Sequence, residues 1–211
     1  MTDANKSISL SELFGSIVQS LQNDKNYLNH LDSSGGNANH GDNILHNFQV
    51  IKDTIDQYPE QAPSSQLMQA ANQLRGGGSG ATAALYAEGL KQAAKALQGK
   101  KDGLSLNEVV PFLQGLAGGV QSQTDARPGQ GTLLDSLVPG VESYVQARNS
   151  GQSNAQAIMH AMSSALHGSR QVQNQPNGYS KAPHDGQNWV DPGANSATSI
   201  LEGMFNKISS L

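Results

Sequence analysis

The sequence predicts an all-helical single domain, built as an antiparallel bundle or closed barrel of eight helices. Apolar residues recur at the three- and four-residue spacing of one helical face wherever a pattern is readable. No segment of comparable length shows the apolar–polar alternation of a half-buried strand. Eight such segments with mostly short connections favour antiparallel neighbours. The 211 residues, 36% of them hydrophobic, suffice for one core, so residues 1–211 are assigned to one domain.

Two of the helices carry a clear start signal. Ser9 with Glu12, and Ser105 with Glu108, have the spacing at which each side chain satisfies a backbone N–H of a helix start. The apolar stripes behind these starts are Leu10, Leu13, Phe14, Ile17, Val18 and Leu21, and Leu106, Val109, Val110, Leu113, Leu116 and Val120.

The other helices follow from the same spacing. A stripe from Ile44 to Tyr58 predicts a second helix, which Pro59 ends. Further helices are expected over 64–74, 79–98, 132–148, 153–170 and 193–209.

Composition excludes several functions. A formal net charge of -4, with 13 scattered basic residues, gives no basic surface for nucleic acid or an anionic membrane. The absence of cysteine excludes disulfides, thiolate catalysis and zinc–thiolate sites. No apolar stretch approaches the roughly 18 to 20 residues that span a bilayer, and MTDANKSISL does not resemble a signal peptide. A cytoplasmic protein is expected.

Two connections, 30–43 and 171–193, are long, polar and rich in Gly, Asn and His. Connections of this kind inside a compact domain are usually functional or disordered. The first gathers oxygen-bearing side chains that suit either Mg²⁺ or Ca²⁺, or an ordinary turn. The second contains Trp189, whose large apolar area favours docking of this segment against the domain.

Glycine-rich segments precede two of the expected helices. In residues 75–80, RGGGSG, the backbone can approach a ligand closely, and the N-terminus of the next helix favours a phosphate. The segment is therefore either a phosphate cradle or a flexible turn, and it is not a Walker A loop because no Lys-Ser/Thr follows. Residues 129–132, GQGT, form a second such entry, with Thr132 as N-cap and Asp135 three positions later.

Four segments, in this order along the chain, resemble motifs of the nucleotide-binding L-subunit domain of dihydroxyacetone kinases. They are LDSSGGNANHGDNI (31–44), GGGSG (76–80), DARPGQGTLLDSL (125–137) and DPGA (191–194). The resemblance implies an eight-helix barrel that binds ATP or ADP at one rim, with the phosphates held by two Mg²⁺ ions under three aspartates.

Transfer of the family's motifs to this sequence identifies candidate site residues. The metal positions are Asp32, Asn37 and Asn39, with Asp42 as a further carboxylate nearby. Because Asn37 and Asn39 replace aspartates, a weakened Mg²⁺ site is expected. The nucleotide-binding positions are His40, Asn43, Gly77, Gly78, Ser79, Gly80, Thr132, Leu133, Arg170, Asp191, Pro192 and Gly193.

Three functions remain open from the sequence. The first is a divergent nucleotide- or phosphate-binding domain with weak or absent phosphoryl transfer. The second is an active phosphotransferase in which Asp32 and Asp42 hold the cation and a separate subunit binds dihydroxyacetone or another acceptor; by family analogy a fatty acid kinase role belongs here. The third is a non-catalytic interaction module. A separate acceptor-binding subunit and a second copy of this chain are the candidate partners.

Overall fold

The computed structural model describes residues 6–33, 35–171 and 190–211, and these fold into eight α-helices with no strand among them. A single antiparallel bridge joins Ile8 to Leu104. The helices are α1 (Leu10–Asp32), α2 (His40–Asp56), α3 (Pro63–Gly77), α4 (Thr82–Ala96), α5 (Leu106–Ser122), α6 (Leu134–Asn149), α7 (Asn154–Gln171) and α8 (Pro192–Ile208).

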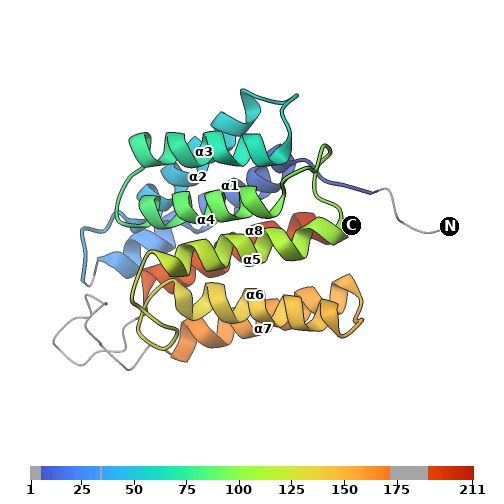
Figure 1. Ribbon diagram of the computed structural model, residues 1–211. Coiled ribbons are helices and arrows are strands. Elements are labelled where there is room, and N and C mark those ends of the chain that lie inside the picture. Colours follow the sequence, from blue (N-terminus) through green and yellow to red (C-terminus); the bar gives the residue numbers. More distant parts are fainter. Residues whose placement is uncertain (1–5, 34, 172–189) are drawn as a thin grey trace.

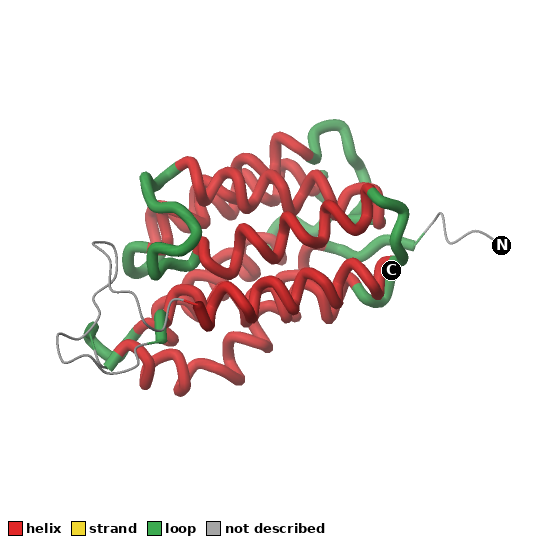
Figure 2. The backbone as a smooth tube through the Cα atoms, turned by 90° about the horizontal axis from the view of Figure 1, so that it is seen from below, coloured by secondary structure: helices red, strands yellow, loops and turns green. Residues whose placement is uncertain are grey.

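The helices form a closed antiparallel ring. Each helix packs against the next one in the chain, and α8 returns to pack along α1 (Figure 1). The helices run side by side, with their connections gathered at two ends (Figure 2). The first turns of α2, α4, α6 and α8 therefore lie at one end, on the left in Figure 1. The predicted all-helical antiparallel barrel is confirmed.

Local sequence signals explain where the helices begin. Both predicted capping boxes are present, Ser9 with Glu12 on α1 and Ser105 with Glu108 on α5. Proline occupies the first position of α3 and of α8, where its missing N–H costs no hydrogen bond. The structure differs from prediction between α3 and α4, where α3 continues through Gly77 and α4 begins only at Thr82.

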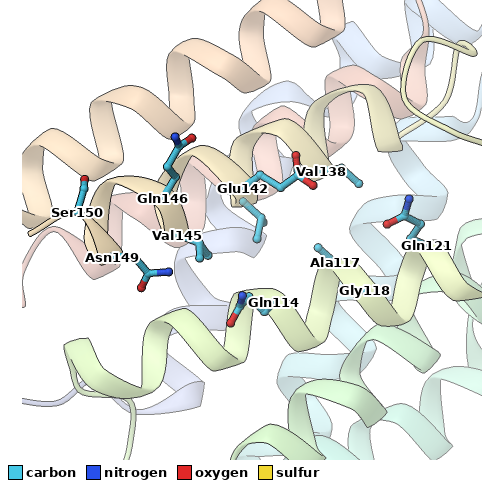
Figure 3. Close-up of a pocket in the computed structure, with 11 residues that line it drawn as sticks. Gln114, Ala117, Gly118, Gln121, Val138, Glu142, Val145, Gln146, Asn149 and Ser150 are labelled. Carbon is cyan, nitrogen blue, oxygen red and sulfur yellow. The ribbon is translucent and has the colours of Figure 1, made fainter. Parts of the chain in front are cut away.

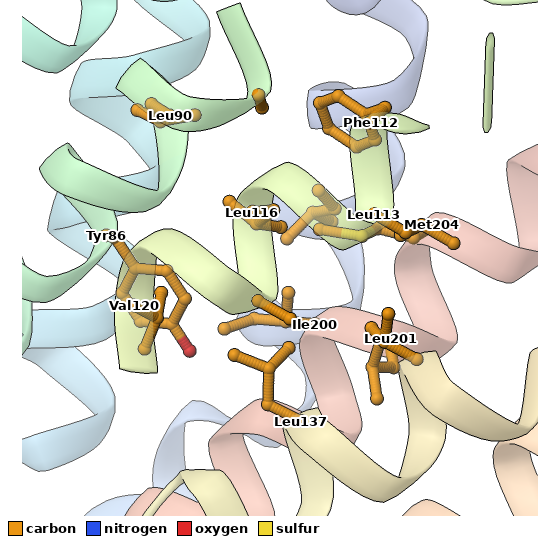
Figure 4. Close-up of a cluster of buried hydrophobic side chains, with 14 of the residues drawn as sticks. Tyr86, Leu90, Phe112, Leu113, Leu116, Val120, Leu137, Ile200, Leu201 and Met204 are labelled. Atoms are coloured by element: carbon orange, nitrogen blue, oxygen red, sulfur yellow. The ribbon is translucent and has the colours of Figure 1, made fainter. Parts of the chain in front are cut away.

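The apolar stripes meet inside the ring in one continuous core. Figure 4 shows part of it, where Tyr86 of α4, Leu116 of α5 and Ile200 of α8 converge. Phe48 of α2 stacks edge-on against Tyr86, with ring centroids 5.1 Å apart. This core joins helices distant in sequence and holds the two ends of the ring in a fixed arrangement.

Glycines bring α4 and α5 unusually close together. A Cβ added to Gly119 would lie 2.6 Å from the carbonyl oxygen of Glu88, and one added to Gly89 would lie 2.8 Å from that of Leu116. Any larger residue at either position forces the two backbones apart. The close approach fixes the position of α4, whose first turn lines the cavity described below.

No helix within the described residues is both long and apolar enough to cross a membrane. Trp189 and most of the second polar connection lie outside the described residues, so the expected docking of that tryptophan stays a prediction.

Candidate functional site

A cavity of about 280 Å³ opens at the end of the ring where the even-numbered helices begin. Four segments distant in sequence contribute to it: the α1–α2 connection, the first turn of α4, the loop before α6 and the start of α8. The lining residues are Asp32, Gly35, Gly36, His40, Ala81, Thr82, Leu85, Gly131, Thr132, Leu133, Asp191, Pro192 and Gly193. We call this the rim cavity.

The loop before α4 is held in place by a buried asparagine of α2. Asn47 is fully buried. Its Nδ2 donates to the carbonyl oxygen of Ser79 at 2.8 Å, and its Oδ1 accepts from the Ser79 N–H at 2.7 Å. The His46 imidazole lies 2.9 Å from the carbonyl oxygen of Gly77. These contacts fix the glycine-rich segment as an ordered loop, which favours the cradle over the flexible turn.

The N–H groups at the start of α4 are left open. Those of Gly80, Ala81 and Thr82 have no acceptor among the described residues, and no side chain caps this helix. Gly80 has φ +69°, a conformation that glycine adopts without strain. Adjacent N–H groups at a helix start, aided by the helix dipole, form a favourable environment for an anionic oxygen.

Asp32 caps the start of α2. Its Oδ2 accepts hydrogen bonds from the N–H groups of Asn39 at 3.0 Å and His40 at 3.2 Å. Asn39 itself, at the N-cap position, makes no capping bond, and its side chain instead accepts from Asn43 at 3.1 Å. The one retained carboxylate of the expected metal triad thus also has a structural role.

Asp42 faces away from the rim cavity. Its carboxylate accepts from Asn29 at 2.7 Å and lies 3.3 Å from the Lys25 ammonium group, both on α1. These two hydrogen bonds, Asn29 first, hold the pKa of Asp42 below its usual range. Asp42 does not line the cavity.

Two buried carboxylates lie at the starts of α6 and α8, namely Asp135 and Asp191, and the second lines the cavity. Asp135 accepts from the N–H groups of Gly129 and, at 2.6 Å, Thr132. The Thr132 hydroxyl accepts from the Leu134 N–H at 3.3 Å, so both side chains expected at this helix entry accept hydrogen bonds from its backbone. α6 nevertheless begins one residue later than it would with Thr132 as its N-cap. Asp191 caps α8, accepting from Gly193 at 3.0 Å and Ala194 at 3.1 Å.

Burial dominates the ionisation of Asp191. Loss of water around its carboxylate raises its pKa to about 7, against the lowering effect of its two backbone hydrogen bonds, and the negative charge of Asp135 adds to the rise. Burial also lowers the pKa of His40, and this effect outweighs the negative charge of Asp32, which raises it. The His40 ring lies 2.9 Å from the Ser196 hydroxyl. Burial thus favours the neutral imidazole over its charged form.

The structure brings together seven of the sequence-predicted site residues, namely Asp32, His40, Thr132, Leu133, Asp191, Pro192 and Gly193. The predicted Gly78, Ser79 and Gly80 form the loop beside the cavity, and the predicted Gly77 is the last residue of α3; none of the four lines the cavity, and Asn43 packs next to Gly80. Arg170 is exposed near the end of α7 and does not line the cavity. Sequence reasoning missed Asn47, whose signal was a polar residue inside the apolar stripe of α2.

The donor set around Asp32 suits a pair of divalent cations poorly. Asn37 and Asn39 are exposed and offer amide oxygens without charge. Within the described residues, no three His, Cys, Asp or Glu side chains gather closely enough to hold a metal ion. Oxygen ligands with negative charge are what Mg²⁺ prefers, and here Asp32 shares one oxygen with two N–H groups.

A second hollow of about 810 Å³ lies between α5 and α6. Its floor is apolar, with Ala117, Val138 and Val145, and its edges carry Gln114, Gln121 and Glu142 (Figure 3). The lining comes from the middle and C-terminal turns of the two helices, where backbone N–H groups are engaged within the helix. This groove is larger than the rim cavity, and no helix start with open backbone N–H groups lines it.

The described residues form a ring of eight antiparallel helices with a cavity at the starts of its even-numbered members, and this defines the class: a helical-barrel protein with a cavity at its rim. The profile of the DAK2 domain matches residues 36–206, and the chain belongs to this family. The resemblance noted in the sequence is thereby confirmed.

Two curated relatives are ADP-binding subunits DhaL of PEP-dependent dihydroxyacetone kinases. The Escherichia coli (strain K12) protein is 27% identical over 179 residues, covering 83% of this chain and 85% of the relative. The subunit of dihydroxyacetone kinase 2 from Listeria innocua is 27% identical over 138 residues, covering 63% of each chain.

The fold is shared with a larger solved protein. The dihydroxyacetone kinase of C. freundii, in its native form, matches with a TM-score of 0.70 and 16% identity, over 98% of this chain and 37% of that one. Its complex with AMP-PNP and Mg²⁺ matches with a TM-score of 0.70 and 15% identity, over 98% of this chain and 36% of that one. The chain thus spans just over a third of that kinase.

Proposed function

We propose that the chain is a nucleotide-binding domain that holds an adenine nucleotide in the rim cavity and has weak or absent phosphoryl transfer. The observation that carries the proposal is the open start of α4, where the N–H groups of Gly80, Ala81 and Thr82 have no acceptor among the described residues. Asn47 holds this loop in place from α2. The relatives named as ADP-binding subunits support an adenine nucleotide as the ligand.

Weak phosphoryl transfer follows from the chemistry of the Asp32 region. Phosphoryl transfer depends on cations that neutralise charge on the transferred group, and positioning alone leaves most of the barrier in place. An active phosphotransferase that uses Asp32 and Asp42 needs both carboxylates at the nucleotide. Asp42 instead pairs with Lys25 on α1, which makes this alternative the weaker one.

A separate acceptor-binding subunit is the partner that we propose if any transfer occurs. The relatives are subunits by name, and the substrate that their names give is dihydroxyacetone. The names carry no statement about a homodimer, so that partner stays a prediction.

The variant Ala81→Asp separates binding from folding. A carboxylate in the first turn of α4 competes for the N–H groups that the phosphate needs and repels the phosphate. At a helix start it also stabilises by about 0.3–1 kcal/mol, so the fold is not weakened. Because Ala81 is exposed, the larger side chain meets no steric barrier. We expect at least a tenfold loss of AMP and ADP affinity, measured by isothermal titration calorimetry.

The matched control is Ala81→Asn, which has nearly the same size and no charge. It should retain affinity within about threefold, since that factor is under 1 kcal/mol. Equal affinity of Ala81→Asp and the unmodified protein would place the phosphate elsewhere, and no binding by the unmodified protein would contradict nucleotide binding itself.

A further inference from the structure

Four helix starts meet at the rim cavity, and they differ in the side chain that supports each of them. Asp32 accepts from N–H groups at the start of α2, Asp135 from those before α6, and Asp191 from those at the start of α8. The start of α4 is instead supported by the neutral amide of Asn47. An ionised carboxylate repels a nearby phosphate, and a neutral amide does not.

Open N–H groups alone do not distinguish α4 from α6. At the start of α6, those of Gly131 and Leu133 have no acceptor among the described residues, as is the case at the start of α4. Thr132, which stands between them, donates its N–H to Asp135 at 2.6 Å. A phosphate at α6 would therefore lie close to a carboxylate, whereas the first turn of α4 has no acidic residue. Charge thus favours the start of α4 for the phosphate.

The buried amide of Asn47 fits its surroundings in one orientation. Its Oδ1 accepts from the Ser79 N–H at 2.7 Å and its Nδ2 donates to the Ser79 carbonyl oxygen at 2.8 Å. Exchange of the two amide atoms would place donor against donor and acceptor against acceptor. The second hydrogen of Nδ2 is directed to the Thr82 hydroxyl oxygen, at 3.3 Å from Nδ2. Because burial of an amide is costly unless its groups are paired, these contacts hold Asn47 and its partners in place.

The Thr82 hydroxyl is consequently able to donate its hydrogen to a ligand. A hydroxyl has one hydrogen and two lone pairs, and Asn47 occupies one lone pair, so the hydrogen points away from Nδ2. No acceptor for this hydrogen is present in the part of the chain that the structure describes. Thr82 is half-buried and lines the rim cavity. Its hydroxyl is thus a hydrogen-bond donor at the cavity, in the same turn as the open N–H groups of α4.

We propose that Thr82 is a specificity-determining residue of the rim cavity, and that its hydroxyl donates a hydrogen bond to a phosphate oxygen of the bound nucleotide. The inference rests on the proposed nucleotide binding and adds a residue that discriminates phosphorylated from unphosphorylated ligands. A hydrogen bond to a charged oxygen is stronger than one to a neutral acceptor, so the contribution of Thr82 depends on the phosphate. The segment that resembles the family's glycine-rich motif ends at Gly80, so that motif does not include Thr82.

The experiment is a ¹H–¹⁵N NMR titration with adenosine, AMP and ADP at constant millimolar Mg²⁺. The proteins are the unmodified chain, Thr82→Val, Thr82→Ser and the control Thr54→Val. Valine has nearly the shape of threonine without the hydroxyl, and serine keeps the hydroxyl. Thr54 is buried on α2 outside the cavity, and its hydroxyl donates to the Val50 carbonyl oxygen at 2.7 Å. Thermal unfolding without ligand checks that each variant is folded.

We expect Thr82→Val to lose about tenfold in affinity for AMP and for ADP, while its binding of adenosine stays as in the unmodified protein. Thr82→Ser should retain its AMP and ADP affinity within about threefold, and Thr54→Val should bind all three ligands as the unmodified protein does. The Ser79 N–H signal reports on the loop itself. Both hydrogen bonds between Asn47 and Ser79 remain in Thr82→Val, so this signal should keep its position in the absence of ligand.

Other results would overturn the inference while nucleotide binding itself stands. AMP and ADP binding by Thr82→Val as tight as that of the unmodified protein would show that the hydroxyl does not contact the phosphate. A loss that is equal for adenosine and AMP, or that comes with a displaced Ser79 signal, would assign the hydroxyl a structural role. Absence of AMP and ADP binding by the unmodified protein would instead contradict the proposed function, and the inference with it.

Discussion

Replacing both Asn37 and Asn39 by aspartate is expected to make ADP binding depend on Mg²⁺. With Asp32 at the end of α1, the double variant has three carboxylates at and within the connection that leads into α2. A unit-charge pair about 4 Å apart at an effective dielectric near 20 is worth roughly 4 kcal/mol before dehydration is repaid. We expect millimolar Mg²⁺ to raise the ADP affinity of this variant at least tenfold, measured by titration with and without the metal.

The control for this prediction adds the same charge elsewhere. Asn72 on α3 and Asn206 on α8 are exposed and line no part of the rim cavity, so their joint replacement by aspartate should leave ADP binding indifferent to Mg²⁺. If the Asn37 and Asn39 variant gains no Mg²⁺ dependence, the change from the family's metal site extends beyond these two side chains.

The unmodified protein is expected to lose stability as the pH rises toward 7 because Asp191 ionises, and the variant Asp191→Asn is expected not to show this loss. In the folded protein the pKa of Asp191 is raised to about 7, above its ordinary value, so folding favours the protonated carboxyl. The contribution to the free energy of unfolding is complete below about pH 4 and is lost as the pH rises to about 7. A rise of about three pKa units corresponds to a contribution on the order of 4 kcal/mol.

Asparagine cannot ionise and is as good an N-cap as aspartate, and its amide oxygen keeps one of the two hydrogen bonds at the start of α8. Thermal unfolding of both proteins between pH 5 and pH 8 measures the effect. The melting temperature of Asp191→Asn should exceed that of the unmodified protein by several degrees at pH 8, with a smaller difference at pH 5. A difference that is constant across this range would show that Asp191 does not titrate there.

The sequence predicted the helices well because their signals are local. The capping pairs Ser9 with Glu12 and Ser105 with Glu108 lie three residues apart, and the apolar stripes need only the helical repeat. The resemblance to the kinase subunit identified several segments that meet at the rim cavity. Helix ends were less well predicted, since Gly77 is helical and the glycine run alone suggests a loop.

The roles of the site residues could not be predicted, because they depend on contacts between distant segments. The Asp32 carboxylate reaches across the connection to cap α2, and Asn47 holds a loop 32 residues further along the chain. The direction in which Asp42 points is set by Lys25 and Asn29 on another helix. The pKa of Asp191 is raised by burial, which depends on how four segments pack around the cavity. A sequence motif carries no information on this packing.

The most direct test of nucleotide binding at the rim cavity is a ¹H–¹⁵N NMR titration of the chain with AMP and with ADP. The rim cavity and the α5–α6 groove are lined by different residues, so their backbone N–H signals report on binding at each one separately. We predict that the largest shifts occur at Gly80, Ala81 and Thr82, with smaller ones at Gly36 and Gly131, while Ala117 and Val141 in the α5–α6 groove stay unchanged. Shifts confined to the groove, or no shifts at saturating nucleotide, would contradict the rim cavity as the binding site.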